Sequence, residues 1–194
     1  MNLFPIFTSS ATAEGLYAIR VDNEKKDEFE RNLNLWSNPG YVIKYLEKNK
    51  AYLQTAYYKN DSIDSLAVKI EKEALELERL IYKLAEDGFD KSIRSLQNLF
   101  KPLDNREYRL YVHQKSKAVI SDHHFPGPIL RMYAIRIAAN TFVITGGVIK
   151  LTFQMDDHID TINELEKLKK TKAFLIANNL TTEEDIKLFI YEQS

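Results

Sequence analysis

The chain has 194 residues, of which 44% are hydrophobic and 28% charged, and its formal net charge is −1. This composition is typical of a globular domain and excludes an intrinsically disordered chain. Cysteine is absent, which excludes disulfide bridges, thiolate zinc sites and cysteine nucleophiles and favours a reducing, cytoplasmic setting. The N-terminus lacks the basic and long apolar regions of a secretory signal, and no apolar run reaches about 18 residues, so we expect no membrane span.

The first half of the sequence predicts one strand followed by helices. Gly15–Val21 combines aromatic and β-branched residues, which favour a strand. Helices follow from the helical spacing of apolar residues, over 25–36, 41–58, 61–86 and 89–100. In the longest of these, an apolar stripe runs from Ile63 to Leu84. The stripe fits either a helix packed on its own domain or a coiled-coil arm.

The second half predicts strands and then two helices. Residues 106–120 alternate in the manner of a strand, and 130–152 predict a hairpin that turns near 138–140. Gly146 and Gly147, inside the second strand of that hairpin, indicate a β-bulge or a close backbone approach. Two amphipathic helices are predicted to follow, over 160–178 and from Thr181 or Thr182 to about Tyr191.

The order of these elements predicts an α+β fold. The last three predicted strands are joined by short connections, so they must pair antiparallel, and the first strand must join them to be stable. We therefore expect a small antiparallel sheet of about four strands, with helices packed on one face and a long helical insertion between the first two strands. We expect one domain over 1–194, with the insertion at 41–100 and C-terminal helices at 158–194.

Basic residues concentrate in the middle of the chain. Residues 101–150 contain eight Lys or Arg and three acids, whereas the remainder is acidic overall. Such an excess on strands favours a polyanionic partner, and the alternative is a solvated face whose cations pair with acidic helices. The sequence contains no phosphate-binding loop, dinucleotide fingerprint, nucleophile elbow or zinc-ligand spacing, so it predicts no metal and no cofactor.

The predicted hairpin brings two of these cations to one end. Arg131 begins its first strand and Lys150 ends its second, so antiparallel pairing places both at the end opposite the turn. Cations on the preceding strand reach the same surface, where they could hold an RNA backbone, and tyrosine rings there could stack on bases. The predicted RNA-binding residues are Arg109, Lys115, Lys117, Arg136 and Tyr111.

The same segments resemble the RelE/ParE/HigB toxin superfamily. The last two sheet strands of that superfamily, with an arginine at the start and a lysine at the end, are similar to LRMYAIRIAANTFVITGGVIKLT here. The preceding linker and strand are similar to FKPLDNREYRLYVHQ, and the first strand is similar to GLYAIRV. The resemblance implies a small antiparallel sheet. In the RelE and HigB branches it also implies a ribosome-dependent, metal-independent mRNA endonuclease that is partnered by an antitoxin.

The resemblance also implies roles for individual residues. Such enzymes cleave RNA by attack of a 2′-hydroxyl on the neighbouring phosphate, with help from cations, a base and an acid. By position, Arg131 and Lys150 match phosphate-stabilising residues. His158, a few residues beyond the last strand, is the nearby imidazole that could serve as the acid.

Several features separate the chain from that superfamily. It is longer than typical members, it carries the insertion at 41–100, and it is slightly acidic where ribosome-directed toxins are strongly basic. These differences leave open a non-catalytic binding or regulatory protein that keeps the fold and acts through protein–protein contacts. Use of 61–86 as an arm would then predict a homodimer or a heteromer. A metal-independent hydrolase of a small substrate is a third reading, which no motif supports.

Overall fold

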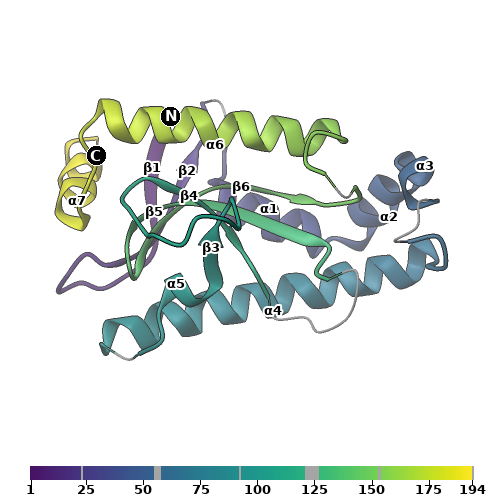
Figure 1. The fold of residues 1–194 in the computed structure, drawn as a ribbon, viewed down its shortest axis with the longest axis horizontal. Helices are drawn as coiled ribbons and strands as arrows, with labels where there is room; N and C mark the ends of the chain where they lie inside the picture. Colours follow the sequence, from purple (N-terminus) through teal and green to yellow (C-terminus); the bar gives the residue numbers. More distant parts are fainter. Residues whose placement is uncertain (23, 55–57, 92, 121–126, 153, 194) are drawn as a thin grey trace.

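The chain forms one six-stranded mixed sheet with helices on both faces (Figure 1). This computed structural model describes residues 1–22, 24–54, 58–91, 93–120, 127–152 and 154–193. The strands are β1 (Asn2–Thr8), β2 (Gly15–Arg20), β3 (Phe100–Pro102), β4 (Gln114–Ala118), β5 (Leu130–Ala138) and β6 (Thr141–Ile149). Their order across the sheet is β1-β2-β6-β5-β4-β3. Neighbouring strands pair antiparallel except β2 and β6, which are parallel.

Two groups of helices cover the sheet. Between β2 and β3 lie α1 (Glu28–Trp36), α2 (Pro39–Lys48), α3 (Lys50–Leu53), α4 (Ile63–Phe89) and α5 (Leu96–Leu99). After β6 come α6 (Ile159–Ala177) and α7 (Glu183–Glu192). Figure 1 shows α4 along one side of the sheet and α6 along the other. The sheet is therefore the middle of three layers.

The two faces of the sheet belong to two separate apolar cores. On β5, Met132 and Ala134 face the core under α1, α2 and α4, whereas Tyr133 and Ile135 face the core under α6 and α7. Strands that are buried on both faces have nearly continuous apolar sequences, which explains the apolar character of the hairpin segment. We call these faces the α4 side and the α6 side.

Side-chain caps set the starts of several helices. The carboxylate of Asp27 accepts hydrogen bonds from the first backbone N–H groups of α1. Asn38 caps α2, with Pro39 at its first turn, and Ser62 caps α4. At α7, Thr182 and an aspartate three residues later form a reciprocal capping box. The start of α7 is the one that the sequence predicts. The helix predicted over 41–58 is divided into α2 and α3, and the one predicted over 89–100 is reduced to α5.

Helix α4 contains the apolar stripe that the sequence singles out. Its members Leu66, Ile70, Leu77 and Ile81 are almost completely buried and belong to the α4-side core. The helix packs against α1, α2 and α5. The stripe is therefore part of the core of this chain, and of the two readings the packed helix is the one that the structure supports.

The predicted four-stranded antiparallel sheet with helices on one face is wrong. Among the described residues the sheet has six strands, and β2 lies parallel to β6. After β2 the helical segment carries the chain to the far edge of the sheet, and the antiparallel strands β3, β4, β5 and β6 then return it to the side of β2. Strand β1 escapes a pattern search because Pro5 interrupts it. That proline sits beside a register shift on an edge strand, a position where the missing N–H is tolerated. The α+β class itself is confirmed.

The region before the hairpin also differs from the prediction. Of 106–120, only Gln114–Ala118 forms a strand, and 106–113 is a loop with exposed aromatic and aliphatic side chains such as Tyr108. The alternation of apolar and polar residues in 106–113 therefore does not mark a strand with one buried face. The hairpin, in contrast, forms as expected, and pairing shifts by one residue beside Gly146. Gly146 has a φ of +152°, which favours glycine, and the predicted bulge is confirmed.

Candidate functional site

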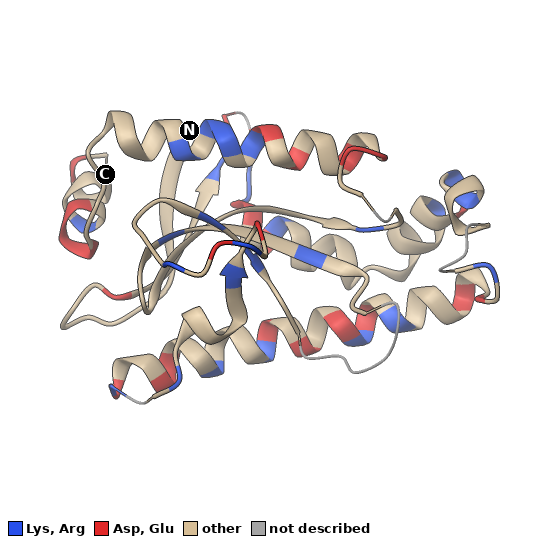
Figure 2. Ribbon diagram, in the orientation of Figure 1, with Lys and Arg blue, Asp and Glu red and all other residues tan. Residues whose placement is uncertain are grey.

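Three of the predicted site cations lie on one face of the sheet. Lys117 pairs with Tyr133, and Arg131 pairs with Val148; both partners face the α6-side core. Paired residues in an antiparallel sheet share a face, and Lys150 lies two residues beyond Val148, so it continues on that face. We call Lys117, Arg131 and Lys150 the cation cluster. Figure 2 shows basic segments on these neighbouring strands near the middle of the sheet.

The three cations affect one another electrostatically. Partial burial, and then the positive charge of Arg131, lower the pKa of Lys117. Burial also lowers the pKa of Lys150, and Arg131 and Lys117 lower it further, while Asp157 acts in the opposite direction. Burial is the larger cause of both shifts, and repulsion from the neighbouring cations, which disfavours the protonated form of an amine, adds to it.

Neutral oxygen atoms hold two of these cations in place. The Lys117 ammonium donates to the backbone oxygen of Leu103 at 3.0 Å and to Oδ1 of Asn105 at 2.9 Å. The Arg131 guanidinium donates to two backbone carbonyls, those of Pro128 and Leu130. Among the described residues, no carboxylate lies within ion-pair distance of Lys117 or Arg131. Their charge is oriented but not neutralised.

A groove of about 660 Å³ adjoins the cation cluster between the loop after β3 and helix α6. Leu103, whose carbonyl accepts from Lys117, lines the groove. So do two residues of the predicted RNA-binding set, Lys115 and Tyr111. The ammonium of Lys172, from α6, lies 5.7 Å from the centre of the Tyr111 ring. The groove therefore offers cations and an aromatic ring next to one another.

Two predicted RNA-binding arginines lie apart from this arrangement. Arg136 pairs with Phe142, which faces the α4-side core, so its side chain leaves the sheet on the face opposite to Arg131. Burial lowers the pKa of its guanidinium. Arg109 is exposed in the loop before β4 and does not lie on the predicted strand. Neither belongs to the cation cluster.

His158 occupies a structural position. It is 3% exposed and caps the N-terminus of α6, where its Nδ1 accepts the backbone N–H of Asp160 at 3.2 Å. Its Nε2 lies 3.0 Å from Oδ1 of Asn49, and the ring of Tyr52 packs edge-on against the imidazole. Both ring nitrogens have partners inside the protein, so the geometry gives no support to His158 as an acid that reaches a substrate.

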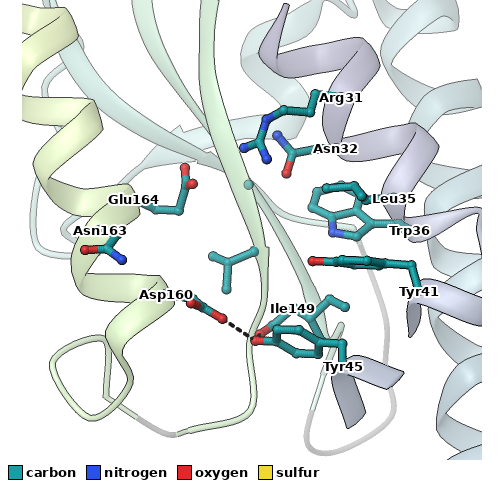
Figure 3. A pocket seen from close by; sticks show the side chains of 12 residues that line it. Arg31, Asn32, Leu35, Trp36, Tyr41, Tyr45, Ile149, Asp160, Asn163 and Glu164 are labelled. Carbon is teal, nitrogen blue, oxygen red and sulfur yellow. Dashed lines mark hydrogen bonds between the residues drawn. The ribbon is translucent and has the colours of Figure 1, made fainter. Parts of the chain in front are cut away.

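A second site, which the sequence did not predict, lies beyond the carboxyl ends of β2 and β6. These two strands are parallel, but β2 leads into α1 on the α4 side and β6 leads into α6 on the opposite side. Connections that leave neighbouring parallel strands on opposite faces open a crevice between them, a common location for ligand sites. Here the crevice is a cleft of about 190 Å³ (Figure 3).

Four charged side chains form a compact cluster beside this cleft. Arg31 makes a two-point contact with Glu28, at 3.1 Å and 2.7 Å. Lys167 joins the two acids, with its ammonium 2.6 Å from Glu28 and 2.7 Å from Glu164. Gly146 leaves the space for them, because a Cβ there would collide with the carboxylate of Glu164. We call Glu28, Arg31, Glu164 and Lys167 the ionic cluster.

The two acids of the ionic cluster differ in their pKa. Burial pushes the pKa of Glu28 upward, but Arg31 and Lys167 outweigh this effect and leave it below its usual value. Burial dominates at Glu164 and raises its pKa to about 7, despite the nearby Lys167. Oε2 of Glu164 is also buried without a hydrogen-bond partner. Glu164 is therefore the less satisfied of the two acids.

Aromatic side chains form the opposite wall of the cleft. Tyr41 and Tyr45 lie with their rings nearly parallel, 6.1 Å apart, and the Tyr45 hydroxyl donates to Asp160 at 2.7 Å. The ring of Trp36 lies against Gly147, where any Cβ would collide with it. Figure 3 shows these rings facing Asp160 and Glu164 across the open space. Gly146 and Gly147, where the sequence predicts only a bulge or a close backbone approach, are the sequence signal that could have located this site.

Comparison with known proteins does not assign the chain to a family. No family model matches the sequence, and no curated protein or solved structure is significantly similar to it. None of the helices in the described ranges is both long and apolar enough to cross a membrane. Within those ranges, no group of three or more His, Asp or Glu side chains is arranged to hold a metal ion. The function has to be inferred from the cation cluster, the groove and the cleft.

Proposed function

We propose that the chain binds single-stranded RNA and holds one phosphate among Lys117, Arg131 and Lys150. The observation that carries this proposal is that three cations from neighbouring strands gather on one face, and that two of them, Lys117 and Arg131, have only neutral partners among the described residues. A group of like charges on one face of a sheet is suited to an external polyanion. The resemblance to RelE and HigB toxins makes mRNA the polyanion that we propose.

The groove supports an RNA strand over a lone phosphate. Its cations Lys115 and Lys172 can contact further phosphates, and the Tyr111 ring can stack on a base. Acidic residues also line it, including Asp104 and Glu107. Asp104 is already paired with an arginine, Arg106, at 2.7 Å. The proposed path therefore runs along the groove and ends at the cation cluster.

We further propose that RNA held in this way is cleaved without a metal, as in the toxins that the sequence resembles. The 2′-oxygen bonds to phosphorus, the bond from phosphorus to the 5′-oxygen breaks, and the products carry a 2′,3′-cyclic phosphate and a 5′-hydroxyl. A neutral lysine accepts the 2′-hydroxyl proton and a protonated one supplies a proton to the 5′-oxygen. The lowered pKa values of Lys117 and Lys150 support this exchange, and Arg131 stabilises the charge on phosphorus.

One observation favours a second function, binding without cleavage. His158, the only imidazole that the resemblance offers for catalysis, is buried and engaged on both nitrogens. A protein that kept the cation cluster but lacked an efficient acid would bind RNA or an acidic partner without cutting it. An antitoxin and the ribosome follow from the resemblance alone and belong to the first proposal.

Binding of a fluorescent single-stranded RNA at several salt concentrations tests the proposal. We expect Lys117→Met, Arg131→Met and Lys150→Met each to weaken binding about 10-fold and to reduce the slope of log affinity against log salt by about one. Lys187→Met is the matched control, because it removes the same charge from an exposed position of α7. Equal losses in the control and the cluster variants would reject the site.

Cleavage is assayed on the same RNA by gel electrophoresis in the presence of a chelator. We expect a product with a 2′,3′-cyclic phosphate, reduced in the three cluster variants. His158→Asn should cleave like the unaltered protein, because the asparagine oxygen can replace Nδ1 in capping α6. Salt-dependent binding without any product would favour the non-catalytic function, and absence of binding would reject both.

A further inference from the structure

The helical insertion at 41–100 contacts the strand end that carries Arg131. Glu73 of α4 accepts two backbone hydrogen bonds through a single carboxylate oxygen, Oε2. The donors are the N–H of Ile129 at 2.8 Å and the N–H of Leu130 at 2.9 Å, and these two residues directly precede the arginine. Hydrogen bonds to a carboxylate are roughly twice as strong as those between neutral groups. Glu73 therefore fixes two successive peptide groups at the start of β5.

The first of these peptide groups, which joins Pro128 to Ile129, orients the Arg131 guanidinium. Its N–H donates to Glu73, and its carbonyl accepts from Nη1 of Arg131. A peptide group is planar, so the direction of its N–H sets the direction of its carbonyl. Nη1 also donates to the Leu130 carbonyl at 2.9 Å. The guanidinium is thus held by backbone groups that Glu73 holds in turn.

The second peptide group, which joins Ile129 to Leu130, contacts the strand end that carries Lys150. Its N–H also donates to Glu73. Its carbonyl, that of Ile129, accepts the backbone N–H of Lys150 at 2.7 Å. One carboxylate oxygen of the insertion therefore fixes backbone that contacts two of the three residues of the cation cluster.

The charge of Glu73 does not explain its position. Burial raises the pKa of Glu73, against the effect of the two N–H groups and of the cations Lys69 and Arg131. Its ion pair with Lys69 is long, at 3.9 Å, and its Oε1 is buried without a hydrogen-bond partner among the described residues. A carboxylate in this state is costly to bury, and its charge reduces the attraction of nearby cations for a polyanion. The hydrogen bonds to the start of β5 are therefore the feature that accounts for an acid at this position.

We propose that Glu73 is a positioning residue of the RNA-binding site, which aims the Arg131 guanidinium at the bound phosphate through the peptide groups that it fixes. This role rests on RNA binding at the cation cluster, and it gives a function to the insertion that separates the chain from RelE and HigB toxins. Glu73 belongs to α4, on the other side of the sheet from the cluster, so it acts through the backbone and not by contact with RNA.

RNA binding at several salt concentrations separates positioning from charge. Glu73→Leu removes the acceptor, so we expect about 10-fold weaker binding and a slope of log affinity against log salt that falls by about one, as for Arg131→Met. Glu73→Gln keeps an oxygen for the two N–H groups and should bind at least as tightly as the unaltered protein. If only the charge of Glu73 mattered, both variants would bind RNA more tightly.

Two further variants control for the change of side chain and for folding. Glu71→Leu makes the same change at an exposed position of α4 and should not weaken RNA binding. Glu73→Asp keeps the charge but withdraws the oxygen by one methylene group, so it should weaken binding as Glu73→Leu does. It replaces that variant if thermal unfolding shows that leucine prevents folding. Full RNA binding by the folded variant, or an equal loss in Glu71→Leu, would overturn the proposal.

Combination with Arg131→Met shows whether Glu73 acts through that arginine. Once the guanidinium is absent, Glu73→Leu should weaken binding by a further factor of about 3 or less, because only the contact with Lys150 remains to be disturbed. A further loss of about 10-fold, equal to that in the unaltered background, would mean that the substitution acts through the fold as a whole. The positioning role would then be wrong.

A titration of Lys117 tests the positioning without RNA. The charge of Arg131 contributes to the lowered pKa of Lys117, so a displaced guanidinium should let that pKa rise. NMR of isotopically labelled lysine should show the rise in Glu73→Leu and in Arg131→Met, but not in Glu73→Gln. If the unaltered protein binds no RNA, the proposed function fails, and this titration alone decides whether Glu73 positions Arg131. An unchanged Lys117 pKa in Glu73→Leu would overturn the positioning role in either case.

Discussion

The cation cluster and the ionic cluster both lie next to β6, yet they treat charge in opposite ways. In the ionic cluster, Lys167 forms ion pairs with Glu28 and Glu164, and Arg31 donates two hydrogen bonds to Glu28. In the cation cluster, the partners of Lys117 and Arg131 in the part of the chain that the structure describes are neutral oxygen atoms. The first arrangement satisfies most of its charge internally. The second leaves the positive charges of Lys117 and Arg131 without a carboxylate at ion-pair distance in the described ranges.

This difference suggests how to separate structural charge from functional charge in a protein of unknown activity. Buried opposite charges satisfy one another, and removal of one partner leaves the others costly to bury. Grouped like charges repel, so their removal relieves the folded state, and their presence calls for a ligand. The same chemical substitution should therefore have opposite effects on stability in the two clusters.

The largest effect is expected from Lys167→Met in the ionic cluster. The substitution leaves Glu28 with Arg31 and the Asn32 amide, and it leaves Glu164 with no cation in contact among the described residues, while both acids remain buried. Loss of one partner of a buried ion pair typically costs about 3–5 kcal/mol, so we expect a decrease of that order in the free energy of unfolding. Urea denaturation at pH 7 measures it.

Lys169→Met provides the matched control for that measurement. Lys169 lies on the same helix and pairs with Glu166 at 2.5 Å, but both side chains are more than half exposed. Exposed pairs contribute about 0–1 kcal/mol, so this variant should stay close to the unaltered protein. A similar loss in both variants would mean that the ionic cluster does not behave as a buried unit.

The next effect is a pH dependence that belongs to Glu164. The pKa of this residue is raised from its usual value near 4.5 to about 7. The folded protein therefore keeps a proton on Glu164 across a range in which the unfolded chain releases it. Stability from this group is fully present below pH 4.5 and is lost as the pH rises toward 7, by an amount on the order of 2 kcal/mol.

Glu164→Gln isolates this contribution, because glutamine resembles the protonated acid in shape and does not titrate. We expect the stability difference between the variant and the unaltered protein to shift in favour of the variant between pH 5 and pH 7. Urea denaturation of both proteins at the two pH values gives that difference, in which other titrating groups cancel. A difference that does not change with pH would show that Glu164 is ionised in the folded protein throughout.

Much of the fold follows from local sequence signals, and the exceptions have physical causes. The hairpin and the bulge at Gly146 were evident from apolar periodicity and glycine, α4 from its apolar stripe, and α7 from its cap. The sheet was mispredicted because a strand pair such as β2 and β6 is fixed by packing between distant segments. Strand β3 has only three residues and no pattern of its own. Sequence periodicity indicates which face of a helix or strand is buried, but it does not identify the helix or strand that packs or pairs with it.

The candidate sites differ in the same way, since one could be predicted from local sequence and the other could not. Strand alternation was sufficient to place Arg131 and Lys150 together, since both belong to one hairpin. The ionic cluster combines Glu28 and Arg31 of α1 with Glu164 and Lys167 of α6. In the sequence these look like ordinary helix-surface charges at i, i+3 spacing. Only the two faces of the sheet and the missing side chain of Gly146 bring them together and bury them.

The smallest expected effect on stability is that of Lys117→Met. It distinguishes the two clusters most clearly, because Lys167→Met makes the same change of side chain in the ionic cluster. The substitution removes one of three repelling cations, at the cost of two hydrogen bonds to neutral acceptors. We expect the free energy of unfolding to stay the same or rise by up to about 0.5 kcal/mol at low salt.

Added salt decides whether repulsion is the cause. At about 1 M salt the screening length falls to about 3 Å, so repulsion among exposed parts of the cluster is weakened and any gain from Lys117→Met should shrink. Denaturation at low and high salt, run beside Lys167→Met, compares the same change of side chain in both clusters. A loss of several kcal/mol in Lys117→Met would mean that this lysine is a structural anchor. In that case Lys117 would serve to stabilise the fold and not to bind a phosphate. The proposed difference between the two clusters, functional charge in one and structural charge in the other, would then be wrong.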